Sequence, residues 1–442
     1  MLKKSKIGQQ PQRRPKGALL TAAEACKFLG VRAQTVYAYV SRGWLTPLPN
    51  PRGRGSLYPR AELENLLARS RARAGHGATA ASALRWGEPV LESSITAIGT
   101  DNLYYRGRAV ADLLERKTTF EQVAELLWSG DLPAHPPVWP TANFVASIPA
   151  CATSDSGCEL SRQLFAMASA SACADLDGSI ELTDKTVQRA RGFLQQAAGI
   201  FKPRLTKDPA AIRNESTVDH PTGSIASKIS MQLGHGPESE QAVDSALIAC
   251  ADHELNTSTF AARVAASTGA DFYGCLLAAL GAFSGQRHGL SPVSVYDFVV
   301  SCQNPRGATQ MLKRLLAQHE ELPGFGHHLY PDGDVRARFL LKAARAVATS
   351  EAAKIHLQVI EALIDAADDA GAPPPNLDLG LAAIALALDA SSTTGAALFA
   401  VGRIAGWTAH ILEQRQQNFM LRPRARYIGR GTQRRELTAK IR

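Results

Sequence analysis

From about residue 86 to its end, this chain is rich in alanine and leucine and has few runs in which β-branched and polar residues alternate. Such a pattern favours helices over strands. Hydrophobic residues are 45% of the 442 residues and charged residues 20%, so the chain has enough apolar side chains to fill the core of a globular protein. The sequence therefore predicts a mainly α-helical fold, with loops at 133–140 and 371–376, where proline and glycine cluster.

The positive charge of the chain is concentrated at its amino-terminal end. Residues 1–75 hold 15 Lys and Arg against 3 Asp and Glu, a balance of +12, whereas the whole chain carries +9, so the remainder carries −3. This asymmetry indicates a polyanionic partner for the amino-terminal segment, or else a solvated basic tail. We expect residues 1–17 to be a disordered basic arm and residues 71–85, which are small and polar, to be a linker.

Residues 18–70 have the pattern of a helix-turn-helix module. Thr21 and Glu24 have the spacing of a capping box before one helix, and a second helix is expected around residues 33–41. The stretch 43–58 is rich in Gly, Pro and Arg and can form a hairpin wing, after which a third helix is expected. The segment resembles the winged helix-turn-helix of the MerR and excisionase group.

In that resemblance, the second helix and the wing would bind DNA. The side chains expected to reach base edges or phosphates are Arg32, Gln34, Thr35, Tyr37, Arg42, Arg52 and Arg54. The same pattern is also compatible with a small domain that packs on the rest of the protein or on another protein, and this alternative stays open.

Cysteines and apolar runs indicate the compartment. The chain has seven Cys, an odd number without any CxxC pair, which argues against a disulfide framework and against a zinc site. The longest apolar run, 379–388, is about half of the ~20 residues that a membrane span needs. Residues 1–17 lack the apolar stretch of a signal peptide. We therefore expect a cytoplasmic protein without membrane association.

Several common catalytic motifs are missing from the sequence. It has no GxSxG elbow, Walker A loop, HExxH motif or dinucleotide-binding fingerprint. Its eleven His do not fall into metal-ligand spacings, apart from the adjacent pair His327 and His328, whose side chains would point apart on a regular element. Chemistry in this chain must therefore come from acids, bases and arginine side chains.

Four sites combine titratable residues with turns or helix ends. The segment 251–268 places His253 between Asp and Glu in an Ala-rich stretch expected to be helical, where burying these groups is costly unless partners satisfy them. Glycines next to His288 and His327 let the backbone approach a ligand closely. Asp378 lies between a Pro-rich loop and an apolar helix, where loss of solvent raises the pKa of a carboxyl toward that of a useful base.

Each of these residues also has an ordinary structural explanation. A single His in a helix is more often a structural residue than a ligand-binding one. Asp378 can be the N-cap of the apolar helix, and Arg403 and Arg422 can pair with Glu413 or cap helix ends. Only the combination of these residues therefore carries a functional prediction.

Taken in order, the segments resemble the signature regions of citrate synthases and 2-methylcitrate synthases. The family motifs stand here as Asp252-His253-Glu254, His288-Gly289, Gly324-Phe325-Gly326-His327 with Asp334-Val335-Arg336, Asn376-Leu377-Asp378, and Arg403 with Arg422-Pro423. The stretch 103–133 resembles the YRG…LL…G-LP region of the family. Order and spacing match from about residue 86 to residue 429.

The resemblance implies the condensation of acetyl-CoA with oxaloacetate and water to citrate and CoA, a step of the tricarboxylic acid cycle. Asp378 would remove a methyl proton from the thioester, His288 would stabilise the enolate, and His327 would polarise and protonate the ketone of oxaloacetate. In a 2-methylcitrate synthase, propionyl-CoA would replace acetyl-CoA. The CoA thioester is a substrate, and no metal or redox cofactor is implied.

The resemblance also implies a set of residues that bind oxaloacetate. These are His253, Asn256, Arg336, Phe399, Arg403 and, from a partner subunit, Arg422. Arginine suits a dicarboxylate because its planar guanidinium binds a carboxylate with two hydrogen bonds. If Arg422 reaches a neighbouring site, the protein must be a homodimer or a higher homo-oligomer.

The implied fold is a citrate-synthase-like pair of helical domains around a cleft. The large domain would comprise residues 86–289 and 390–442, and the small domain, residues 290–389, would close over the cleft and exclude water. Neighbours that shape the substrate site depart from the family pattern at Cys250, Leu290, His328, Val335, Leu379 and Gly380. A transcription regulator that uses this fold as a metabolite sensor, and binds DNA through its amino-terminal module, therefore stays open beside the enzyme.

Overall fold

The structure is a computed structural model in which the chain forms two compact units, Met1–Glu92 and Ser93–Arg442. The residues that it describes are 19–29, 31, 33–41, 45–50, 55–60, 62–63, 91–99, 102–139, 159–175, 183–201 and 223–423. The predicted arm and linker lie outside these residues, as do Arg32, Arg42, Arg52 and Arg54.

The first unit is a small module built around two short helices. Its elements are β1 (Leu19–Thr21), α1 (Ala22–Leu29), α2 (Ala33–Ser41), β2 (Leu48–Pro49) and β3 (Ser56–Pro59). The strands form an antiparallel sheet of order β1-β3-β2. The capping box at the start of α1 is confirmed, because the Thr21 amide donates to Glu24 Oε2 at 2.8 Å and the Glu24 amide donates to Thr21 Oγ1 at 3.3 Å.

A small apolar core holds this module together. Its buried residues are Ala25, Val36, Leu45, Tyr58 and Leu63. β2 and β3 pair in the stretch where the sequence predicts a hairpin, with Leu48 opposite Leu57. On α2, Gln34 is exposed and Tyr37 is 58% exposed, so both side chains are accessible to a ligand of this unit.

The second unit begins with a small antiparallel sheet that the sequence pattern does not predict. Its strands are β4 (Thr96–Ile98), β5 (Leu103–Tyr105) and β6 (Arg108–Ala109), in the order β4-β5-β6. Strands of two or three residues are too short for hydrophobic alternation to become visible, which explains the omission.

Helices make up most of the rest of the second unit, which confirms the predicted mainly α-helical fold. They are α5 (Val110–Glu115), α6 (Phe120–Ser129), α7 (Glu159–Ala174), α8 (Thr183–Ala197), α9 (Ile225–Gln232), α10 (Glu240–Cys250), α11 (Thr257–Ser267), α12 (Phe272–Phe283), α13 (Ser291–Ser301), α14 (Pro305–Ala317), α15 (Val335–Val347), α16 (Glu351–Asp369), α17 (Leu377–Ala387) and α18 (Thr394–Gln417), with 3₁₀ turns η1 (Ala198–Ile200) and η3 (Pro237–Ser239).

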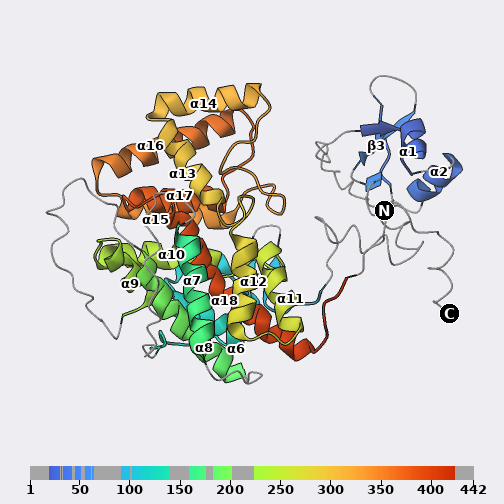
Figure 1. The fold of residues 1–442 in the computed structure, drawn as a ribbon. Helices are drawn as coiled ribbons and strands as arrows, with labels where there is room; N and C mark the ends of the chain where they lie inside the picture. The colour runs from blue at the N-terminus through green and yellow to red at the C-terminus, as the bar shows by residue number, and fades with distance from the viewer. Residues whose placement is uncertain are drawn as a thin grey trace, which may run out of the picture. The chain divides into compact units, whose positions relative to one another are not determined.

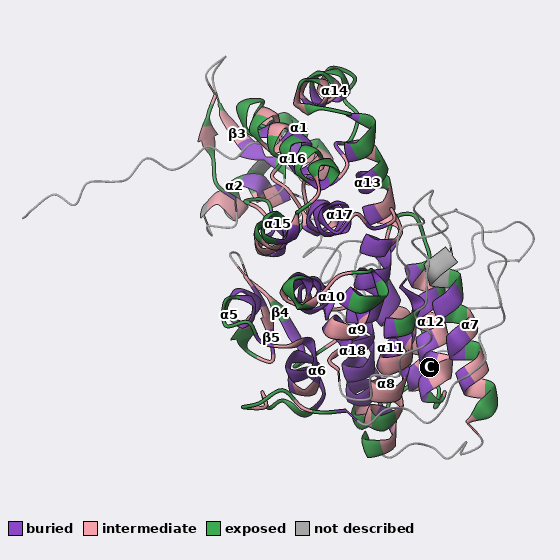
Figure 2. Cartoon of the chain, turned by 90° about the vertical axis from the view of Figure 1, so that its left-hand side faces the viewer, coloured by how far each residue is buried: buried purple, intermediate pink, exposed green. Residues whose placement is uncertain are grey.

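The helices of the second unit form two groups (Figure 1). Helices α13 to α17 gather at one end, and α6 to α12 gather at the other end together with α18, in this view and in the rotated view of Figure 2. α18 packs against α6, α8, α10 and α11. By length and composition α18 can cross a membrane, but its most apolar 18-residue window is entirely buried, so it is the core helix of this unit.

Close packing of α15 on α17 brings the N-terminal ends of these two helices together. A Cβ atom on Gly380 of α17 would lie 2.8 Å from Leu340 Cβ of α15, which leaves no room for a larger residue. At the helix ends, the amide of Leu377 donates to Asp334 Oδ2 at 3.1 Å. The candidate site is built around these ends.

Candidate active site

Five segments that are distant in the sequence meet in one cluster, whose side chains are buried or half-buried. The end of α10, the α12–α13 turn, the loop before α15, the start of α17 and the middle of α18 contribute to it. The ring centroids of His253 and His327 are 5.4 Å apart, and those of His288 and Phe399 are 5.8 Å apart. The guanidinium of Arg403 lies 4.8 Å from the ring centroid of Phe399.

His253 lies in the segment between α10 and α11, not within a helix as expected from the sequence. α10 ends at Cys250, and Glu254 has a positive φ of 53°, so the chain turns at this point. The His253 ring is buried, and its Nε2 is 2.9 Å from the Tyr330 hydroxyl. Burial, followed by the positive charges of Arg336 and Arg403, holds the pKa of His253 well below its ordinary value.

His288 is held by a hydroxyl at the start of α11. Its Nε2 is 2.8 Å from Ser258 Oγ, which accepts a hydrogen bond from the Trp407 indole at 3.1 Å. Asn256, the N-cap of α11, accepts from the Thr259 amide at 3.1 Å and also lies 2.8 Å from Ser258 Oγ. Burial and then the charge of Arg403 lower the pKa of His288 to about 4, so the ring is neutral at pH 7.

His327 follows a Gly-Phe-Gly turn that is tied to the chain before α17. The φ angles of Gly324 and Gly326 are 84° and 76°, a conformation that favours glycine. The Gly326 amide donates to the Pro374 carbonyl at 2.7 Å, and the Asn376 side-chain amide donates to the Gly326 carbonyl at 2.9 Å. These bonds fix His327 relative to the start of α17.

The protonation of His327 follows from its contacts. Its Nδ1 accepts the Leu329 amide at 3.1 Å, so in the neutral ring the proton is on Nε2. Burial and then the charge of Arg336 lower the pKa of His327 to about 4, so the ring is neutral at pH 7. It can therefore donate a hydrogen bond from Nε2 to a ligand.

Asp378 is the second residue of α17, and the alternative that it is the N-cap is wrong. The N-cap is Asn376, whose side-chain oxygen accepts the Asp378 amide at 3.0 Å. One carboxylate oxygen of Asp378, Oδ2, accepts the Ser291 hydroxyl at 2.7 Å. Burial raises the pKa of Asp378 to about 6, while the Ser291 hydrogen bond and the Arg336 charge act to lower it.

Two buried arginines in the cluster have different partners. Arg336 is 1% exposed and donates to both carboxylate oxygens of Asp334, at 2.9 and 2.8 Å. Arg403 is also 1% exposed, and its Nε donates to the Cys250 carbonyl at 2.6 Å. Within the part of the chain that the structure describes, Arg403 has no carboxylate within ion-pair distance, so its positive charge is available to an anionic ligand.

Arg422 is not part of this cluster. It is exposed, and the preceding Leu421 donates its amide to Ser267 Oγ at the end of α11, at 3.1 Å. Gln417, the last residue of α18, is fourteen residues beyond Arg403, or ~21 Å along a helix axis. Within one chain, Arg422 therefore lies away from the cluster that contains Arg403.

Glu413 pairs with Arg263 and not with either arginine that the sequence suggested. Arg263 Nη1 donates to Glu413 Oε2 at 2.6 Å and to His410 Nδ1 at 3.1 Å. Nε2 of His410 is 3.2 Å from Asp252 Oδ2. This chain of hydrogen bonds ties α11 and α18 to the residue next to His253 and thereby supports its turn.

The sequence pattern does not predict three polar residues of the cluster. Tyr330 contacts His253 and His327, and Ser258 and Ser291 bind His288 and Asp378. Ser258 belongs to a hydroxyl-rich stretch whose composition was noticeable. A single Ser or Tyr in a loop gives no comparable signal, because its partners come from other segments.

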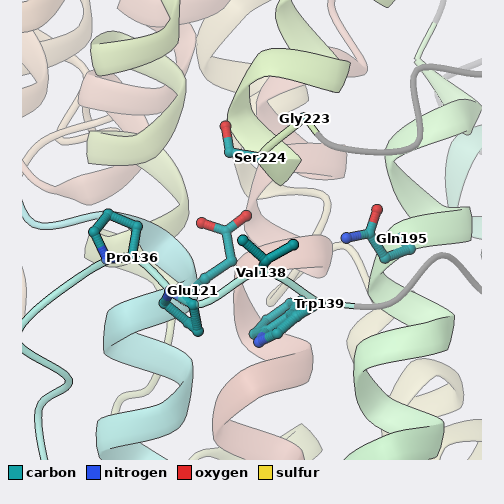
Figure 3. A pocket seen from close by; sticks show the side chains of 8 residues that line it. Glu121, Pro136, Val138, Trp139, Gln195, Gly223 and Ser224 are labelled. Atoms are coloured by element: carbon teal, nitrogen blue, oxygen red, sulfur yellow. The ribbon is translucent and has the colours of Figure 1, made fainter.

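A cavity of about 180 Å³ lies elsewhere in the second unit. It is lined by Glu121, Pro136, Pro137, Val138, Trp139, Gln195, Gly223 and Ser224. Figure 3 shows the Glu121 side chain between α6 and Ser224, and its Oε1 accepts the Ile225 amide at 2.6 Å. The cavity shares no residue with the cluster around Arg403. In the described parts of the chain, no group of three or more His, Cys, Asp or Glu is arranged to hold a metal ion.

Comparisons with known proteins cover both units. The family "Citrate synthase, C-terminal domain" matches residues 83–424, and the family "Helix-turn-helix domain" matches residues 19–71. A "Putative citrate synthase 2" of Mycobacterium tuberculosis is 32% identical over 340 residues, which are 74% of this chain and 87% of the relative. A "2-methylcitrate synthase" of the same organism is 30% identical over 341 residues, 75% of this chain and 85% of the relative.

Solved structures agree with these matches. Citrate synthase from Thermotoga maritima has a TM-score of 0.60 and 25% identity, and the match covers 80% of this chain and 98% of that one. Citrate synthase from Thermoplasma acidophilum, solved as a ternary complex with carboxymethyl coenzyme A and oxaloacetate, has a TM-score of 0.66 and 22% identity over 78% of this chain and 95% of that one.

The class of protein is therefore an acyltransferase that acts on CoA thioesters. More narrowly, the chain belongs to the citrate synthase family, and it carries an excisionase-like helix-turn-helix domain at its amino-terminal end. It is a citrate-synthase-type enzyme, of the group that includes citrate and 2-methylcitrate synthases. The expected citrate-synthase-like helical fold is confirmed.

Proposed function

We propose that this enzyme condenses acetyl-CoA with oxaloacetate and water to give citrate and CoA. The observation that carries the proposal is Asp378, a carboxyl whose pKa is raised to about 6. Hydrogen bonds join the start of its helix to the turns that carry two imidazoles, His288 and His327, which are neutral at pH 7. Enolisation of a thioester needs a base with a pKa near the working pH and a donor that stabilises the developing oxyanion. These three groups supply both.

The hydrogen bonds of His288 suit it to bind the thioester oxygen. In this structure the Ser258 hydroxyl donates to Asn256 Oδ1 at 2.8 Å, and its oxygen also lies 2.8 Å from His288 Nε2. When the Ser258 hydroxyl turns to donate to His288 Nε2, the imidazole proton is on Nδ1, which would donate to the enolate oxygen while Asp378 removes the α-proton. His327 would donate its Nε2 proton to the ketone of oxaloacetate as the carbon–carbon bond forms.

The two buried arginines would bind the carboxylates of oxaloacetate. Arg403 lacks a carboxylate partner among the described residues, and Arg336 is oriented by Asp334. His253 Nε2 lies 2.9 Å from the Tyr330 hydroxyl. When oxaloacetate binds, one of its carboxylate oxygens would replace this hydroxyl and accept a hydrogen bond from His253 Nε2. Phe399, stacked under Arg403, would fix the guanidinium plane.

Three further proposals concern assembly, closure and compartment. Arg422 would complete the site of a second subunit in a homodimer or higher oligomer, because it lies away from the cluster in its own chain. The small domain, residues 290–389, would close over the substrates and exclude water. We assign the enzyme to the cytoplasm, since its seven Cys are odd in number and include no CxxC pair.

CoA release tests this function. The purified chain with oxaloacetate and acetyl-CoA should release free thiol, and Asp378→Ala should lower the rate by roughly 10²–10⁴-fold. Asp332→Ala, an exposed carboxylate before α15, is the matched control and should keep the rate. A parallel assay with propionyl-CoA identifies a 2-methylcitrate synthase if the second thioester is preferred. Absence of release from either thioester would reject the condensing activity.

A regulator that binds DNA through the first unit is the second candidate. It is supported by the helix-turn-helix family match and by the exposed Gln34 and Tyr37 on α2, with Thr35 half-buried between them. Binding of duplex DNA should weaken steeply with salt and should change when oxaloacetate or CoA is added. Turnover at ordinary rates that is unaffected by deletion of residues 1–75, together with no DNA retention, would reject this candidate.

A further inference from the structure

The first residue of α13, Ser291, makes a hydrogen bond to another helix. Serine at a helix start usually caps its own helix, but the N-cap position of α13 is Leu290, which makes no side-chain capping bond. The Ser291 hydroxyl instead donates to Asp378 Oδ2 of α17 at 2.7 Å. The sequence pattern does not predict this contact.

The turn that carries Ser291 is tightly constrained. The Ser291 amide donates to the His288 carbonyl at 3.2 Å, and the Gly289 amide donates to the Phe283 carbonyl at 3.0 Å. A Cβ atom on Gly289 would lie 2.1 Å from the Phe283 ring, so the ring packs directly on this backbone. One four-residue turn therefore carries both the proposed oxyanion donor, His288, and the hydroxyl that binds the proposed base.

Other groups around Asp378 come from three elements. Asp334 and Arg336 face it from the start of α15, and the Cys250 thiol faces it from the end of α10. Arg336 acts to lower the pKa of Asp378 and Asp334 acts to raise it, while the Cys250 thiol stays protonated because burial raises its pKa to about 12. Ser291, from α13, is therefore the neutral group whose hydrogen bond stabilises the ionised carboxylate.

We propose that Ser291 is a positioning residue for the base of this enzyme. Its hydroxyl holds Asp378 Oδ2, which leaves Oδ1 to accept the α-proton of the acyl thioester, and its backbone ties this orientation to His288. The C–H electron pair of the thioester becomes the enolate, and the proton is taken up by Asp378. This inference rests on the condensing activity proposed above.

Ser291→Ala tests the proposal through the pH profile of kcat. Loss of a hydrogen bond to the ionised carboxyl raises its pKa, so the acidic limb of kcat should move up by ~1 pH unit and kcat at pH 6 should fall about fivefold. The KM for oxaloacetate should stay within about twofold. Ser291→Thr keeps the hydroxyl, so its acidic limb of kcat should stay at the pH of the unmodified chain. Ser294 is an exposed serine on the same helix, and Ser294→Ala should have the same pH profile as the unmodified chain.

A second measurement does not depend on turnover. Titration of the chain labelled with ¹³Cγ-aspartate, with Asp378→Asn to assign the resonance, should show the carboxyl of Asp378 titrating ~1 pH unit higher in Ser291→Ala. An unchanged titration, or a shift of equal size in Ser291→Thr, would overturn the positioning role. A chain that releases no CoA but shows the shift would reject the proposed function and keep the hydrogen bond, so the two failures are distinguishable.

Discussion

The N-terminal ends of α15 and α17 carry two carboxyls with opposite behaviour. Asp334 is buried and Asp378 is half-buried, and this loss of solvent works to raise the pKa of each. At Asp334 the two hydrogen bonds and the charge of Arg336 outweigh burial and hold the pKa below its ordinary value. At Asp378 burial dominates, and the pKa rises to about 6. The partner of a carboxyl, more than its burial, decides whether it is a permanent anion or a base.

Breaking the ion pair between Asp334 and Arg336 should have the largest effect on the free energy of unfolding. Asp334→Ala leaves the buried Arg336 without its partner, which costs ~3–5 kcal/mol in the free energy of unfolding because an uncompensated charge remains in the interior. Urea denaturation measures the loss. Asp332→Ala, an exposed carboxylate two residues earlier, is the control, and an equal loss there would contradict this explanation.

Removing the charge of Asp378 should instead increase the free energy of unfolding. The pKa of Asp378 in the folded chain, about 6, lies above the ~3.9 of an unfolded chain, so its contribution to stability is present below that lower value and is lost as pH rises through 6. Asp378→Asn should therefore increase the free energy of unfolding by ~1–2 kcal/mol at pH 8. Thermal unfolding at pH 8 and pH 4.5 checks the sign, because at pH 4.5, which lies between the two pKa values, only part of the gain is expected.

The same pKa predicts the pH dependence of turnover. Asp378 must be ionised to act as a base, so kcat should be about tenfold lower at pH 5 than at pH 8, with an acidic limb near pH 6. His288 and His327, whose pKa values are about 4, should add no limb between pH 5 and pH 8. Steady-state rates over this range test both statements, and a kcat that stays level from pH 8 down to pH 5 would show that the pKa of Asp378 is not raised.

A further loss of stability should come from forcing α15 and α17 apart. A methyl group on Gly380 would meet Leu340 at 2.8 Å, so Gly380→Ala should cost ~1–3 kcal/mol through overpacking. It should also lower kcat modestly, because the helix ends that carry Asp334 and Asp378 would shift. Gly199→Ala, where an added Cβ meets nothing within 4 Å, is the control and should leave the free energy of unfolding and kcat nearly unchanged.

The sequence predicts best the structure that depends on local patterns. The capping box, the two helices of the first unit and the helical character of the second unit depend on neighbours within about four residues, which the sequence shows directly. The order of the His, Asp and Arg motifs gave the family, which the comparisons confirm. The roles of the individual site residues and the limits of the two helical domains stay predictions.

The sequence by itself determined which residue types stand in which order, and hence the family, the helices and the candidate base and acids. Only the tertiary structure decided the burial, the neighbouring charges and the hydrogen bonds of each side chain. Asn376 and not Asp378 caps α17, His253 lies in a turn, and Ser291 contacts the candidate base from eighty-seven residues away. The physical reason is that burial, charge and hydrogen bonding at a side chain are set by segments that only folding brings within a few ångströms.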